Sequence, residues 1–258
     1  PDTTNPHSAT LPHCVGPDAR ARGHALVVGN TAGSLESEHR FLDHFATRRV
    51  EGVFLCSTVS QPDLSSVRMD DVPVVLLNHS AIRPGITSVG TDLRLGARLA
   101  VEHLAGHGHR RVGLVIGTTS DSVPDARHPG WAEAIEALGL QHGPVFTTGF
   151  SSRAAYEAGR RMVAEAGLPT ALFISSDQQS VGVLLALHEA GVRVPEDIAI
   201  VSFDGSELGE YSWPPLTTVA QPIEDMARAA VDLMIDGGGE TTQQVFAPSL
   251  LIRRSGGC

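Results

Sequence analysis

The stretch IAIVSFDGSE, residues 198–207, places an apolar run directly before an acidic residue and a glycine. Apolar runs that do not alternate with polar residues are typical of strands buried on both faces, as in a parallel sheet. Asp204 ends this run, and a carboxylate at that position can serve catalysis, metal binding or ligand binding. Since the ligands of open α/β sheets bind beyond the carboxyl ends of the strands, the stretch predicts both a sheet and a site.

Apolar runs of strand length alternate with helical patterns along the chain. Each run is rich in Val, Ile, Leu or Phe, and the helical patterns place apolar residues at steps of three and four. This alternation predicts parallel sheets with helices on both faces, and the number of units favours two similar halves of roughly 110–130 residues. The predicted strands are 25–29, 53–57, 72–77, 112–117, 171–175 and 198–203, and the predicted helices lie within 92–106, 151–167, 180–191 and 223–239.

One segment in a helical position, SATLPHCVGPDARARGH at residues 8–24, contains Pro12, Gly16 and Pro17. Proline inside a helix lacks a hydrogen-bond donor and clashes with the preceding turn, at a cost of about 3 kcal/mol or more. We therefore expect a broken or shortened helix between Ser8 and Arg22.

The composition is that of an ordinary globular protein, with 41% hydrophobic and 19% charged residues among 258. The net charge is −10 and all 19 basic residues are arginines, which argues against a nucleic-acid-binding surface on this chain. No apolar run approaches the ~18 residues of a membrane span, and the first residues lack the pattern of a signal peptide. Three cysteines without CxxC spacing argue against a disulfide framework or a zinc site, and they fit a reducing cytoplasm. The histidine cluster GHGHRR at 106–111 is expected to be a connecting loop.

Polar side chains follow the predicted strands and should gather at one edge of each sheet. Carboxylates, hydroxyls and an amide in this position suit a hydroxyl-rich ligand, which needs both donors and acceptors. Asp or Ser after a strand is also a common helix N-cap, so Asp177 can serve either role. For Asp204 a ligand-binding role is favoured over a helix N-cap, because Gly205 follows it and no strong helical pattern begins there. The residues are Asn78, His79, Thr118, Thr119, Asp121, Ser175, Ser176, Asp177, Asp204 and Ser206.

Enzyme motifs are missing from the sequence. No GxGxxG or GxSxG motif follows a strand, and a chain without lysine cannot complete a phosphate-binding P-loop. Asp177 and Asp204 could form an acid/base pair, but their separation does not follow from the sequence. A binding protein is therefore favoured over an enzyme.

Several long motifs resemble the lactose-repressor (LacI/GalR) family of bacterial transcription regulators. They are TDLRLGARLAVEHLAGHGHRRVGLV (91–115), GVRVPEDIAIVSFDG (191–205), PPLTTVAQP (214–222) and APSLLIRRS (247–255), in the family's order and spacing. The resemblance covers nearly the whole chain. It implies the periplasmic-binding-protein-like type I fold, with two Rossmann-like parallel-sheet subdomains joined by three crossovers. The implied N-terminal subdomain is 1–90 plus 222–246, and the C-terminal one is 91–221 plus 247–258.

The beginning of the chain departs from the family pattern. PDTTNPH, residues 1–7, resembles the loop that follows the family's first strand. The resemblance therefore implies that this strand of the N-terminal subdomain and the DNA-binding helix-turn-helix headpiece are absent from the chain.

The resemblance also implies effector-binding residues. Arg127 stands four residues before Trp131, where the family has a ligand-binding arginine, although without the family it would read as a surface residue. Asp177 and Asp204 take the places of polar residues after their strands. The remaining positions are Gln221, Asn78 and Phe150, the last two as weaker matches to a polar and an aromatic cleft position.

The implied function is the ligand-sensing and dimerisation region of a cytoplasmic repressor, with a small effector in the cleft between the subdomains. A sugar is the first expectation and a purine or nucleoside the second. The expected partners are the effector, a second copy of the chain, and operator DNA through the separate headpiece, with no cofactor, metal or membrane. The alternative is a periplasmic-type sugar-binding protein of an importer.

Overall fold

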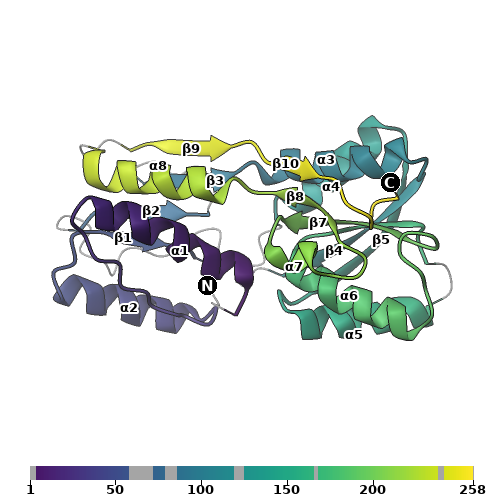
Figure 1. The fold of residues 1–258 in the computed structure, drawn as a ribbon, viewed down its shortest axis with the longest axis horizontal. Helices are drawn as coiled ribbons and strands as arrows, with labels where there is room; N and C mark the ends of the chain where they lie inside the picture. Colours follow the sequence, from purple (N-terminus) through teal and green to yellow (C-terminus); the bar gives the residue numbers. More distant parts are fainter. Residues whose placement is uncertain are drawn as a thin grey trace. The chain divides into compact units, whose positions relative to one another are not determined.

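A computed structural model describes residues 4–57, 72–78, 86–118, 125–165, 168–237 and 241–257. The chain forms two compact units, each assembled from two segments (Figure 1). Unit 1 comprises Pro1–Asp92 and Pro222–Phe246, and unit 2 comprises Leu93–Gln221 and Ala247–Cys258. Both are α/β units built on largely parallel sheets, as the alternation of apolar runs and helical patterns predicts.

The sheet of unit 2 has the strand order β10-β8-β7-β6-β4-β5. Its pairs are parallel except for β10 against β8, which is antiparallel. All six residues of the central strand β7 are buried, which confirms the prediction drawn from the run at 198–203. The strands are β4 (Arg111–Gly117), β5 (Gln141–Thr148), β6 (Ala171–Ile174), β7 (Ala199–Asp204), β8 (Thr217–Ala220) and β10 (Ser249–Leu251).

Helices cover both faces of this sheet (Figure 1). One core cluster joins the sheet to α3 (Leu93–Gly106) and α4 (Arg127–Ala137), and includes the buried Trp131. The other joins it to α5 (Ser152–Ala164) and α6 (Asp177–Glu189), while α7 (Glu207–Glu210) is a single turn. Helix α5 begins as predicted, because the Ser151 hydroxyl accepts a hydrogen bond from the amide of Ala154.

Helices α5 and α6 approach each other closely at two glycines. A Cβ atom on Gly182 would lie 2.0 Å from the carbonyl oxygen of Ser152, and one on Gly159 would lie 2.8 Å from the Cβ of Ala186. Any larger residue at Gly182 would push the helix backbones apart. This packing fixes the start of α6, which carries Asp177.

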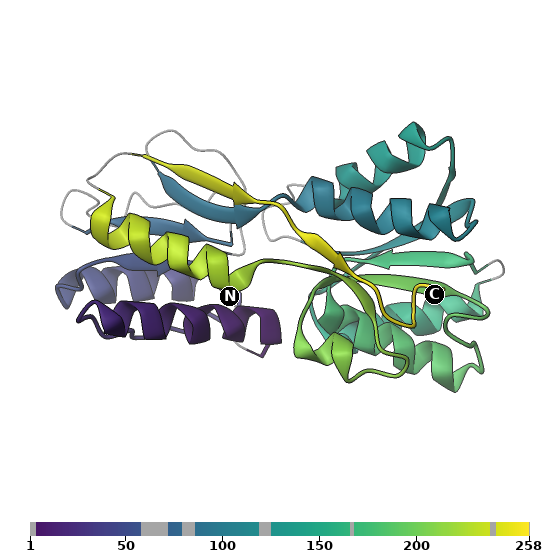
Figure 2. The same cartoon turned by 45° about the horizontal axis from the view of Figure 1, so that its top comes forward.

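Unit 1 has a smaller parallel sheet with the order β1-β2-β3-β9 (Figure 2). Helices α1 (Pro6–Ala21) and α8 (Ile223–Asp236) supply one core cluster, and α2 (Leu35–Thr47) supplies the cluster that contains Val53 and Leu76. No described helix is long and apolar enough to cross a membrane. The strands are β1 (Val53–Leu55), β2 (Val74–Leu77), β3 (Thr87–Thr91) and β9 (Gln243–Phe246).

The prediction of a broken first helix is wrong. Helix α1 runs without interruption from Pro6 to Ala21, with Pro12 and Pro17 inside it. Its apolar side, which includes Leu11 and Val15, packs in the cluster shared with α8, and this burial outweighs the cost of the prolines. The Asn5 side chain caps the helix by accepting from the amide of His7.

The prediction of a strand at 25–29 is also wrong. The segment forms no strand, and the side chains of Val27 and Val28 are 69% and 56% exposed. No described strand pairs with it, and an extended segment needs a hydrogen-bonded neighbour to join a sheet. The first strand that the described sheet of unit 1 contains is β1, beginning at Val53.

Candidate functional site

Five of the six predicted site residues lie in unit 2, at the carboxyl-terminal edge of its sheet. The sixth, Asn78, directly follows β2 in unit 1, where it is exposed and has a φ of 58°. The predicted residues His79, Thr119 and Asp121 lie outside the described residues. In unit 2, Phe150 follows β5, Arg127 begins α4, Asp177 begins α6 after β6, Asp204 ends β7, and Gln221 follows β8.

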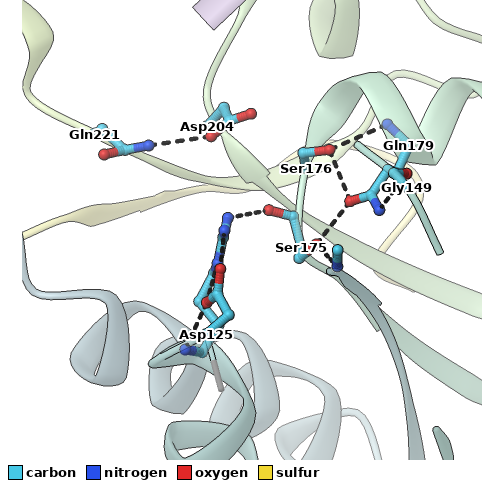
Figure 3. A network of polar contacts seen from close by, with 9 residues as sticks. Asp125, Gly149, Ser175, Ser176, Gln179, Asp204 and Gln221 are labelled. Atoms are coloured by element: carbon cyan, nitrogen blue, oxygen red, sulfur yellow. Dashed lines mark hydrogen bonds and ion pairs between the residues drawn. The ribbon is translucent and has the colours of Figure 1, made fainter. Parts of the chain in front are cut away.

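Arg127 is a buried cation held in one orientation. Its side chain is 10% exposed. Its Nε and Nη2 donate to the two carboxylate oxygens of Asp125 at 2.8 and 2.5 Å, and its Nη1 donates to the carbonyl oxygen of Ser175 (Figure 3). The guanidinium also lies 5.0 Å from the ring centroid of Phe203 and 5.6 Å from that of Phe150, within range of cation–π attraction.

A hydrogen-bond network fixes the carbonyl that receives Arg127. The hydroxyls of Ser175 and Ser176 both donate to the Gln179 side chain, at 2.6 and 2.9 Å. That side chain donates in turn to the carbonyl oxygen of Gly149, which follows β5 (Figure 3). The network therefore ties the ends of β5 and β6 to the first turn of α6.

Asp177 is fully buried and engaged in internal contacts. Its Oδ2 accepts from the amide and the hydroxyl of Ser206, at 2.6 and 2.9 Å, and its Oδ1 accepts from the hydroxyl of Thr218 at 2.8 Å. Burial and the nearby charge of Asp204 raise its pKa to about 6. In this arrangement Asp177 positions the segment after β7, because a ligand could reach it only by displacing these contacts.

Asp204 stands at the end of β7 and is 6% exposed. Gln221 Nε2 donates to its Oδ1 at 3.0 Å (Figure 3). Its φ of 115° lies in a region that side-chain-bearing residues rarely adopt, and such strain costs about 1–3 kcal/mol. Burial raises the pKa of Asp204 to about 7, against the opposing charge of Arg127. Backbone strain and a buried carboxyl with a raised pKa are two features that cluster at functional sites.

The site offers donors and acceptors beside an apolar surface. Arg127 is a fixed donor, Asp204 can accept or, when protonated, donate, and the ring of Phe150 is 37% exposed. Among the described residues, no group of three or more His, Cys, Asp or Glu side chains is arranged to hold a metal ion. This combination suits a small ligand with several hydroxyl or amine groups and one apolar face.

Asp125 is the site residue that the sequence analysis missed. It lies two residues before Arg127, and its side chain is 8% exposed. The signal in the sequence was a carboxylate next to a candidate ligand-binding arginine, but that spacing alone does not distinguish a buried ion pair from a surface loop.

Comparisons with known proteins agree on the kind of molecule. A family model described as "Periplasmic binding protein-like domain" matches residues 101–255. The "Ribose operon repressor" of Escherichia coli (strain K12) is 30% identical over 237 residues, covering 90% of this chain and 72% of that protein. The "HTH-type transcriptional repressor PurR" of Photobacterium profundum is 28% identical over 261 residues, covering 98% of this chain and 78% of that protein.

A solved structure supports the same relationship. It is that of a LacI family transcriptional regulator from Lactobacillus casei with bound sucrose, and it superposes on this chain with a TM-score of 0.85. The two sequences are 30% identical, and the match covers 98% of this chain and 96% of that one. These relatives are transcription repressors and regulators, not enzymes.

Proposed function

Because the chain belongs to the lactose-repressor family of transcription regulators, we propose that it senses a small effector, a sugar first of all, at the Arg127–Asp204 site of unit 2. The coarser function, a ligand-sensing regulatory region, follows from the relatives and the matched domain. What supports this site and this ligand class is the chemistry that the site residues bring together.

The observation that carries the proposal is the pre-oriented Arg127 beside Asp204. A guanidinium held on one side by Asp125 and on the other by Ser175 loses less side-chain entropy on ligand binding than a mobile one would. Asp204 and Gln221 can exchange hydrogen bonds with ligand hydroxyls, and Phe150 can stack on an apolar sugar or base face. Asp177 acts through its contacts with Ser206 and Thr218 as a positioning residue.

Regulation follows from differential binding. A ligand that binds one conformation of the chain more tightly shifts the population towards that conformation. Operator DNA would be contacted by a separate headpiece, since a chain with a net charge of −10 is a poor surface for phosphates. Asn78 of unit 1 stays a prediction as an effector contact.

The chain is also proposed to form a homodimer. Tyr211 and Trp213 of unit 2 are 76% and 79% exposed, and the guanidinium of Arg254 lies 4.6 Å from the ring centroid of Trp213. Exposed aromatic residues beside arginine are enriched at protein interfaces.

Sedimentation velocity should show that the wild type is a dimer and that Trp213→Ser shifts it towards monomer. Val145→Thr alters another exposed apolar side chain and should leave the dimer unchanged. A monomeric protein at all concentrations would contradict the dimer.

A thermal-shift screen tests the proposed effector class. Pentoses, hexoses, disaccharides, nucleosides, and the phosphate esters of the same sugars would each be added to the purified protein. A ligand present at about 100 times its Kd stabilises the folded state by about 2.7 kcal/mol, which raises the melting temperature measurably. We expect a neutral sugar to give the largest increase. Stabilisation by nucleosides alone would replace the sugar with the second candidate.

A further inference from the structure

Asp125 neutralises the charge of Arg127 before any ligand binds. Its Oδ1 accepts from both the amide and the Nε of Arg127, at 2.9 and 2.8 Å, while its Oδ2 accepts from Nη2. This side-on fork is the strongest geometry for a carboxylate and a guanidinium. Burial raises the pKa of Asp125, but the charge and hydrogen bonds of Arg127 outweigh burial and bring that pKa below its usual value. The pair is therefore ionised at neutral pH.

The donor capacity of Arg127 is also largely used. Nε, Nη1 and Nη2 each donate one hydrogen bond to Asp125 or Ser175. A guanidinium has five N–H groups, so two have no hydrogen-bond acceptor among the described residues and can serve a ligand. These two groups can donate to a hydroxyl or carbonyl oxygen. An anion would in addition need the positive charge of Arg127, but the carboxylate of Asp125 already balances that charge.

The charge of Asp125 also affects the pKa of Asp204, which lies outside the ion pair. It raises the pKa of Asp204, whereas Arg127 lowers it. Asp177 adds a third carboxyl group to the same edge of the sheet. One buried guanidinium thus stands among three carboxyl groups, and the carboxylate of Asp125 already balances its charge. Among the residues that the structure describes, no other cation pairs with this group, so an added anion would meet repulsion.

We infer that Asp125 determines the charge class of the effector: it turns Arg127 into a neutralised, fixed hydrogen-bond donor, so that the site accepts uncharged hydroxyl-bearing ligands and rejects phosphorylated or carboxylate-bearing ones. This rests on the proposed function, in which the Arg127 site binds the effector. It goes beyond it by assigning selectivity to a residue that does not itself need to touch the ligand.

The test is a calorimetric titration of inorganic phosphate into the wild-type protein and Asp125→Asn. The asparagine keeps an oxygen for the amide of Arg127 and removes the charge. Working at about pH 6, below the pKa of about 7 for Asp204, keeps Asp204 mostly protonated in both proteins, so its charge contributes little to the comparison. We expect Asp125→Asn to bind phosphate at least about tenfold more tightly than the wild type, which is about 1.4 kcal/mol.

Two control variants locate the effect. Asp197→Asn frees Arg193 from a similar fork on the surface of unit 2, and it should bind phosphate no better than the wild type. Adding Arg127→Gln to Asp125→Asn should abolish the gained binding. If Asp125→Asn does not fold, Asp125→Ser keeps an oxygen for the helix start and takes its place.

The possible results separate this inference from the proposed function. The role of Asp125 would be overturned if the wild type bound phosphate as tightly as the folded Asp125 variant, or if neither protein bound it. This result would not bear on the proposed function, because no effector is present in that titration. In the effector screen, a sugar phosphate that stabilises the wild type more than its parent sugar would overturn the selectivity while supporting effector binding itself.

Discussion

Replacing Arg127 with alanine is expected to lower the free energy of unfolding by about 3–5 kcal/mol, the usual effect of removing one partner of a buried ion pair. The substitution leaves the Asp125 carboxylate, whose side chain is 8% exposed, without its counter-ion. It also removes the cation–π contacts of the guanidinium with the rings of Phe203 and Phe150, and it leaves the Ser175 carbonyl without this donor. Urea denaturation at neutral pH measures the change.

Two comparisons show whether the uncompensated charge is the cause. The double variant Asp125→Ala/Arg127→Ala should recover a large part of the loss, because the Asp125 carboxylate that lost its counter-ion is then removed as well. Arg193→Ala breaks a fork with Asp197 whose partners are 68% and 39% exposed, and an exposed ion pair contributes little to stability. If Arg127→Ala were no more destabilising than Arg193→Ala, an uncompensated buried charge at Asp125 would not be the cause of the loss.

Replacing Asp204 with asparagine is expected to stabilise the protein above about pH 7. The pKa of Asp204 rises from 3.8 to about 7 on folding, mainly through burial. Between these values the folded state binds a proton that the unfolded state does not, so stability falls as the pH rises through this range. At 1.36 kcal/mol per unit, the carboxylate costs on the order of 4 kcal/mol above pH 7, which the amide avoids. Asparagine also tolerates a positive φ.

Thermal unfolding from about pH 4 to pH 8 would reveal the difference. The wild type should lose stability over this range relative to Asp204→Asn, with a smaller loss remaining from Asp177, whose pKa rises to about 6. Asp197→Asn provides a contrast: Arg193 lowers the pKa of Asp197 to about 2, so this variant should be less stable than the wild type by a constant amount from pH 4 to pH 8. Parallel pH profiles for the wild type and Asp204→Asn would contradict the raised pKa of Asp204.

The sequence predicted the strands β1, β2, β4, β6 and β7 and the helices α3, α5, α6 and α8, because their patterns are local. Strand β7 is buried on both faces, so its sequence is an almost continuous apolar run that can be recognised as a strand. Helix α3 buries one stripe, and its period is visible in the residues themselves. The site residue Asp204 could be placed because the end of a parallel strand is also the end of its apolar run.

The elements that were missed depend on distant parts of the chain. Strands β5 and β9 lie at sheet edges and are partly exposed, so their sequences carry little apolar signal. Helix α1 contains two prolines that would end an isolated helix, and only its packing with α8 explains its length. The ion pair of Asp125 with Arg127 depends on burial that no local pattern predicts, including a contact to Ser175, 48 residues away.

The most direct measurement is a calorimetric titration of the effector found by the screen into the wild type and Asp204→Ala. Removing the carboxyl group from the end of β7 is predicted to weaken binding by about tenfold or more, which is about 1.4 kcal/mol. Asp197→Ala, which removes an exposed carboxylate from the same unit, should leave the affinity unchanged. Equal affinities for the wild type and Asp204→Ala would contradict the assignment of the effector site to the Arg127–Asp204 edge of unit 2.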